Sequence, residues 1–186
     1  MTGDRHYCYT LLISVWIIGI ACAHPRSSKE DPKNEIVHLE SIEQCLIIDR
    51  ESKPEKRISC LTDIAGSRNR SMHEKEKAFS LLMDWWKSRD GAGGFWLSDA
   101  FLDVLTADYR FFFSQMKNHP QEYEEWLRDL GKHSFVWFLD PPSPLEGRRR
   151  RLIAFLEDIR DLDTDIDPLR IDLIKELKKI IPRQID

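Results

Sequence analysis

Residues 90–113 read DGAGGFWLSDAFLDVLTADYRFFF, and this stretch predicts the fold. Its three glycines lose too much backbone entropy on ordering to remain helical, so we expect a break over 89–94. Ser98 is a favourable N-cap, and we expect a helix to begin there. Asp108 is then expected to cap a second helix, whose buried face begins with the phenylalanines of 111–113. Two helices joined by a tight turn are typical of an all-α fold.

The rest of the chain continues this helical pattern, because apolar residues recur at steps of three and four. Residues 57–65 fit either a short strand or a helix, and no convincing period-two alternation appears elsewhere. Short loops between amphipathic helices favour antiparallel neighbours. The expected architecture is all-α, with antiparallel helix pairs in a bundle or a short HEAT-like solenoid. Further helices are expected over 34–48, 72–88, 120–131, 146–160 and 168–181, with a short buried helical turn over 134–139.

One combination of motifs resembles a known group of proteins. It joins a turn at Asp90-Gly91, a helix that begins at Leu97-Ser98, and an aromatic second helix at Phe111-Phe112. This combination resembles uncharacterised exported bacterial all-helical proteins with HEAT-like helix pairs, over about residues 72–181. The resemblance implies a helical fold and an extracytoplasmic location, and it brings no activity that could be transferred to this chain.

The N-terminus predicts export. Residues 1–23 contain an uncharged, largely apolar run that ends in Ala21-Cys22-Ala23, the small-residue pattern of a signal-peptidase site. Residues 24–33 are polar and contain two prolines, so we expect a flexible spacer, followed by one helical domain over 34–186. Lipidation of Cys22 is an alternative, because the preceding residues partly match a lipobox. An uncleaved membrane anchor is another, although the run is short for a membrane helix.

Cys45 and Cys60 are the two cysteines that would remain after cleavage. Cysteines in an exported domain commonly pair, so we expect a disulfide between them. Closing a loop of this size would stabilise the fold by about 3 kcal/mol in the chain-entropy model. The alternative is a pair of buried thiols.

Composition and motifs argue against several classes of function. The net charge of -4 disfavours a nucleic-acid binder, which is usually basic. His73-Glu74 begins like the zinc-protease motif H-E-x-x-H, but Lys77 stands where the second histidine is needed. Ser71 and Glu74 instead form the pattern of a helix capping box. We find no P-loop and no nucleophile elbow, so no catalytic residue, metal or cofactor is expected.

Two aromatic sets have different expected roles. Trp86, Trp126 and Trp137 are expected in the core, because they occur at helical spacing. Exposed aromatics are enriched at interaction hot spots. The expected partner surface consists of Trp85, Phe95 and Trp96.

Two charged stretches could carry function. The run Arg148–Arg151 is expected to form a solvated helix face that pairs with acids such as Glu146, Glu157 and Asp158. The alternative is a contact with an anionic lipid or a polyanion. The alternating carboxylates of Asp161–Asp167 match the ligand spacing of a calcium loop. Ile166 stands where that loop needs glycine, and Asp172 stands where it needs glutamate. We therefore expect a plain loop between helices, with Asp167 capping the second helix.

The expected function is binding or structural. The chain would be an exported helical protein of the cell envelope or extracellular space, with another protein as its partner and contact with a membrane only through a lipid or an anchor. The alternative is an enzyme or metal-dependent protein whose acids converge only in three dimensions. A cleft with perturbed, buried acids would favour that alternative.

We predict that the mature protein begins at His24, or at Cys22 if that cysteine is lipidated. Intact-mass measurement on protein from the native host checks this. A mass that retains residues 1–21 would contradict cleavage and favour the anchor.

Overall fold

The computed structural model describes residues 41–48, 54–137 and 143–184, which all belong to the unit His38–Asp186. The expected signal segment, the spacer and Cys22 lie outside the described residues. Among the residues that are described, no helix has the length and apolar character needed to cross a bilayer.

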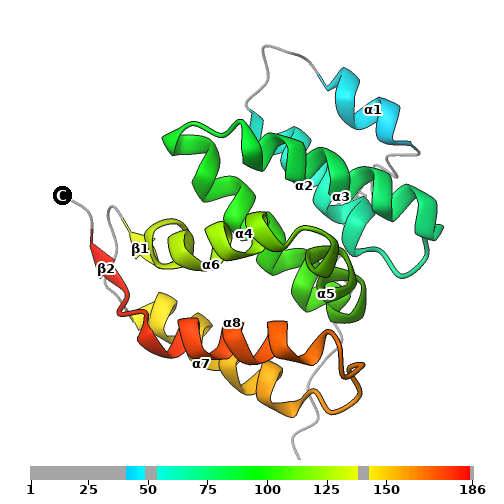
Figure 1. The fold of residues 1–186 in the computed structure, drawn as a ribbon. Coiled ribbons are helices and arrows are strands. Elements are labelled where there is room, and N and C mark those ends of the chain that lie inside the picture. Colours follow the sequence, from blue (N-terminus) through cyan, green and yellow to red (C-terminus); the bar gives the residue numbers. More distant parts are fainter. Residues whose placement is uncertain (1–40, 49–53, 138–142, 185–186) are drawn as a thin grey trace, which may run out of the picture. The chain divides into compact units, whose positions relative to one another are not determined.

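The described residues confirm the all-α class (Figure 1). A two-residue parallel pairing joins β1 to β2, with Val136 opposite Arg183. The stacking of helix pairs in a solenoid stays a prediction. In chain order the elements are α1 (Ile42–Ile47), α2 (Pro54–Gly66), α3 (Met72–Lys87), α4 (Gly91–Ala107), α5 (Tyr109–Asn118), α6 (Pro120–His133), β1 (Val136–Trp137), α7 (Ser143–Asp158), α8 (Asp167–Lys179) and β2 (Arg183–Gln184).

Helix α2 packs against both α3 and α4. The C-terminal ends of α2 and α4 meet, because a Cβ atom on Gly66 would lie only 3.0 Å from the Cβ atom of Ala107. The two helices therefore run parallel to each other, and α3 connects them. On the other side of α2, a disulfide between Cys45 and Cys60 ties α1 to α2, with the Cα atoms 5.6 Å apart.

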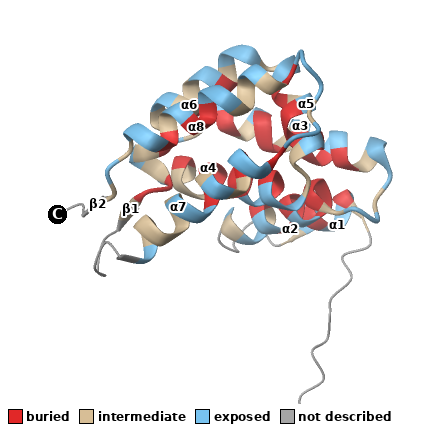
Figure 2. Ribbon diagram, turned by 90° about the horizontal axis from the view of Figure 1, so that it is seen from below, coloured by how far each residue is buried: buried red, intermediate tan, exposed pale blue. Residues whose placement is uncertain are grey.

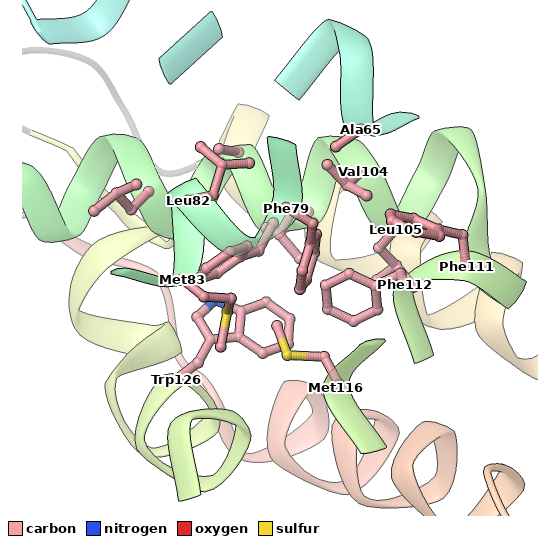
Figure 3. Close-up of a cluster of buried hydrophobic side chains, with 14 of the residues drawn as sticks. Ala65, Phe79, Leu82, Met83, Val104, Leu105, Phe111, Phe112, Met116 and Trp126 are labelled. Atoms are coloured by element: carbon pink, nitrogen blue, oxygen red, sulfur yellow. The ribbon is translucent and has the colours of Figure 1, made fainter. Parts of the chain in front are cut away.

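The core is built from aromatic side chains on α3 to α6, whose inward faces are buried (Figure 2). Phe79, Phe112 and Met116 converge on Trp126 (Figure 3). The rings of Phe112 and Trp126 meet edge to face with centroids 5.5 Å apart, and those of Phe101 and Trp126 are 6.1 Å apart. This geometry is favourable for aromatic pairs beyond the area that they bury.

Two sets of polar contacts lie inside this core. The Nε1–H of Trp126 donates to Ser98 Oγ at 3.0 Å, and Ser134 Oγ lies 2.7 Å from the same oxygen. Lys75 on α3 is buried, and its Nζ donates to Asp108 Oδ2 at 2.5 Å while lying 4.4 Å from the centroid of the Phe111 ring. A buried charge needs such a partner, so this contact fixes α3 against the start of α5.

The last two helices form an antiparallel pair. Arg149 of α7 donates to the carbonyl of Leu177 at 3.0 Å, and Arg170 of α8 donates to the carbonyl of Leu156, also at 3.0 Å. Each contact joins the first half of one helix to the last turns of the other, so the two helices are antiparallel. They lie side by side, as Figure 1 shows.

The expected start of α4 is wrong. The helix begins at Gly91 and not at Ser98, and Asp90 is its N-cap, accepting from the N–H of Gly93 at 2.7 Å. In the first turn the backbone N–H groups have no helical partner, so a good cap outweighs the entropy of the glycines. Ser98 lies inside the helix and is buried.

Residues 57–65, whose sequence fits either a short strand or a helix, are helical within α2. Two smaller expectations are corrected. The stretch 134–137 is not helical but bends and then pairs as β1. Asp167 does not cap α8, since it is the first helical residue and accepts from Arg170 Nε at 2.6 Å.

Several helix signals of the sequence are confirmed. The capping box of Ser71 and Glu74 is present at α3. Asp108 caps α5 by accepting from the N–H of Phe111 at 3.1 Å, and Pro120 begins α6. The expected first helix is described only as α1, because residues before Ser41 lie outside the described ones.

We predict that Gly94→Ala destabilises the fold by about 1–3 kcal/mol. A Cβ atom there would lie 2.7 Å from Cε1 of His133. That ring is itself held edge to face by Trp86 and Phe95. The matched control is Gly91→Ala in the same turn, which has nothing within 4 Å and should stabilise by roughly 0.5–1 kcal/mol. Urea unfolding measures both changes, and equal effects would contradict the steric argument.

Candidate binding groove

A groove of about 580 Å³ lies between α2 and α4. Small residues, among them Gly66, Ala100 and Ala107, line it where the two helices approach each other, so little side-chain volume fills the space. Its volume falls in the range of about 300–1,000 Å³ that is usual for ligand sites.

Four carboxylates surround this groove. Glu55 and Asp63 come from α2, and Asp99 and Asp103 come from α4. On α4 the two aspartates are four residues apart, which places them on one helix face. None of the described residues that line the groove is basic. The groove is therefore a region of negative potential that favours a cationic ligand.

The carboxylates influence one another. Burial raises the pKa of Asp63. Burial also raises the pKa of Asp103, Arg148 opposes this shift, and the nearby charges of Asp99 and Asp63 add to it. Like charges in one site disfavour ionisation, so a bound cation would relieve the repulsion.

Arg148 of α7 already relieves part of the repulsion between these carboxylates. Its Nη1 lies 2.9 Å from Asp99 Oδ1, and its Nη2 lies 3.9 Å from Asp103 Oδ1. The protein thus places its own guanidinium against the two α4 carboxylates of the groove.

Trp96 supplies an aromatic surface. It lines the groove and is half-buried, and its expected place on a partner surface stays a prediction. The face of a tryptophan ring attracts cations. A half-buried indole beside four carboxylates is suited to hold the charged end of a lysine or arginine side chain.

The other two residues of the expected partner surface serve different contacts. Phe95 packs against His133, with centroids 5.1 Å apart. Trp85 is half-buried and packs against the core. Trp86 and Trp126 lie in the core as expected, whereas the side chain of Trp137 lies outside those described.

The run of arginines is divided among several partners. Arg149 and Arg150 both pair with Glu146, each at 2.7 Å, and Arg148 reaches α4. Pairing with Glu146 was expected. The contact with α4 was not, because it depends on how α7 packs.

The acidic loop before α8 is held by side chains of α5. Asp161 accepts from the hydroxyl of Tyr109 at 2.7 Å and pairs with Arg110, and Asp165 pairs with Lys117. In the part of the chain that is described, no three His, Cys, Asp or Glu side chains are grouped as metal ligands.

Sequence reasoning missed the acids of the groove. The spacing of Asp99 and Asp103 was a usable signal once the helix was known to include both. Their approach to Glu55 and Asp63 depends on the packing of α2 against α4, which no local pattern encodes.

No protein-family model, curated protein or solved structure matches this chain. The case for a function therefore rests on the geometry of the groove.

His133 lies beside the start of α4 and gives a prediction about pH. Its Nδ1 is buried without a hydrogen-bond partner among the described residues. Burial lowers its pKa below the ordinary 6.5, Asp129 opposes the shift, and Arg89 and Lys132 add to it. The unfolded chain therefore takes up the proton more readily than the folded one, so this contribution to stability is fully present above pH 6.5 and is lost as the pH falls through the folded-state pKa.

We predict that the wild-type protein loses more unfolding free energy between pH 7.5 and pH 5 than His133→Gln does. Urea denaturation at both pH values measures the difference. As a control, His73→Gln changes an exposed side chain and should keep the wild-type loss. Equal losses in wild type and His133→Gln would contradict the role of the buried imidazole.

Proposed function

We propose that the protein is an exported binding protein that holds a basic segment of a partner protein in the α2–α4 groove. The observation that carries this proposal is that four carboxylates and Trp96 line one groove. The exported location rests on the signal pattern of residues 1–23.

A segment with several basic residues fits the groove better than a single cation. A cation on an exposed aromatic face gains about 0.5–1 kcal/mol. An exposed ion pair gains about 0.2–1 kcal/mol. One lysine would therefore bind very weakly, whereas a chain that places several basic groups along Glu55, Asp63, Asp99 and Asp103 adds such contacts together.

Binding is favoured over catalysis by the exposure of the acids. A catalytic acid at neutral pH needs a strongly desolvated carboxyl. The side chain of Asp103 keeps 64% of its surface exposed, and Asp63 is also exposed. The partial burial of these two carboxyl groups raises the pKa of each. Water can still solvate these charges, which suits the recognition of a cation.

We predict that a fluorescein-labelled hexaarginine peptide binds the purified protein and that Asp63→Asn/Asp103→Asn weakens binding by roughly tenfold. Fluorescence anisotropy at physiological ionic strength measures the affinity. Trp96→Ala should also weaken binding, and it should lower the melting temperature less than Trp126→Ala does, because Trp96 is half-buried whereas Trp126 is fully buried.

The matched control is Glu124→Gln/Asp158→Asn, which removes the same charge from exposed positions outside the groove. It should bind nearly as tightly as the wild type. Equal weakening in both double variants would mean that the peptide responds only to the net charge, and that result would overturn the proposal. So would the absence of saturable binding to the wild type.

A further inference from the structure

A second pocket lies on the other side of Arg148, between α4 and α7. Its volume is about 360 Å³. Leu102 from α4 and Leu152 and Phe155 from α7 supply apolar surface, and Arg148 and Arg151 supply positive charge. An apolar pocket with a few convergent polar groups is the usual form of a small-molecule site.

Arg151 distinguishes this pocket from the surrounding surface. The neighbouring Arg150 pairs with Glu146 at 2.7 Å. No carboxylate among the described residues lies within ion-pairing distance of Arg151, which lines the pocket. The only acid in the described lining is Asp103, and Arg148 stands beside it. The pocket therefore presents one uncompensated guanidinium beside apolar side chains.

We propose that this pocket binds a carboxylate that carries a hydrocarbon chain, of the class of a medium-chain fatty acid. The chain would lie against Leu102, Leu152 and Phe155, and the carboxylate would accept hydrogen bonds from Arg151. A guanidinium can donate two parallel hydrogen bonds to a carboxylate. Removing the chain from water supplies the affinity that an exposed ion pair alone lacks.

The lining favours this ligand over a small inorganic anion. The only hydroxyl among the described lining residues, that of Thr106, already donates to the carbonyl of Asp103 at 3.1 Å. A phosphate or sulfate would need several donors around it, whereas Arg148 already pairs with Asp99 and, among the described lining residues, only the guanidinium of Arg151 is left without an ion pair. The negative charge of Asp103 would also repel a multiply charged anion.

Arg148 connects this pocket with the α2–α4 groove. It pairs with Asp99, which lines only the groove, and approaches Asp103, which lines both. Weakening its contact with Asp99 leaves the guanidinium free to turn toward a carboxylate in the pocket. Any such coupling between two sites is reciprocal in binding free energy. The pocket itself does not depend on the proposed function of the groove.

Calorimetric titration of the purified protein with sodium decanoate, below its micelle concentration, tests the proposal. We expect saturable binding that Arg151→Gln weakens by about tenfold, since a hydrogen bond to a charged group is lost. Arg150→Gln is the matched control and should bind like the wild type, because Arg150 pairs elsewhere. Decan-1-ol, which has the chain without the charge, should bind more weakly than decanoate.

Asp99→Asn tests the part played by Arg148. It removes the partner at 2.9 Å without altering the described lining of the pocket, so decanoate should bind several times more tightly. An unchanged affinity would overturn the coupling through Arg148. The pocket itself would be ruled out by a lack of saturable decanoate binding, by equal affinity for decan-1-ol, or by equal weakening in Arg150→Gln and Arg151→Gln.

Discussion

The hydrogen bond from Trp126 to Ser98 sets the rotation of α4, and both candidate sites depend on that rotation. The donor and the acceptor are buried, so leaving either unpaired would cost about 1–3 kcal/mol. Successive helix residues turn by about 100°. With Ser98 directed at α6, the groove residues Trp96, Asp99 and Asp103 fall within about 60° of one another on a different face. Leu102 and Thr106 lie between that face and the core, on the side where α7 packs.

Local chemistry explains which parts of the fold could be predicted from the sequence. The cap at Asp108 and the capping box at Ser71 involve residues three positions apart, and the sequence displays them directly. The start of α4 was placed wrongly because the entropy lost by its glycines was considered without the stabilising N-cap that Asp90 provides. Serine is a residue type favoured at helix N-caps, yet the hydroxyl of Ser98 accepts from Trp126, which lies far along the chain. The groove needed the packing of α2 on α4, which no short pattern contains.

The four consecutive arginines of α7 show how helix geometry divides a run of like charge. Because each residue turns by about 100°, the four side chains leave the helix in different directions, and only Arg149 and Arg150 share a partner, Glu146, among the described residues. Arg148 reaches α4, Arg149 contacts both Glu146 and the carbonyl of Leu177, and Arg151 lines the second pocket. The four arginines, which in the sequence suggest one basic patch for a polyanion, therefore act as separate groups. Arg148 and Arg149 stabilise the packing of α7, and Arg151, which has no ion-pair partner among the described residues, is available to a ligand.

Arg148 also affects the selectivity expected of the groove. When the groove is empty, this guanidinium offsets the repulsion between Asp99 and Asp103. A basic ligand gains less from these two carboxylates than from unpaired ones, since it must share or replace a contact that already exists. Glu55 and Asp63 on α2 have no such partner among the described residues, so they gain more from a new cation. A ligand that spans both helices is therefore favoured over one that binds α4 alone, which supports an extended basic segment as the occupant.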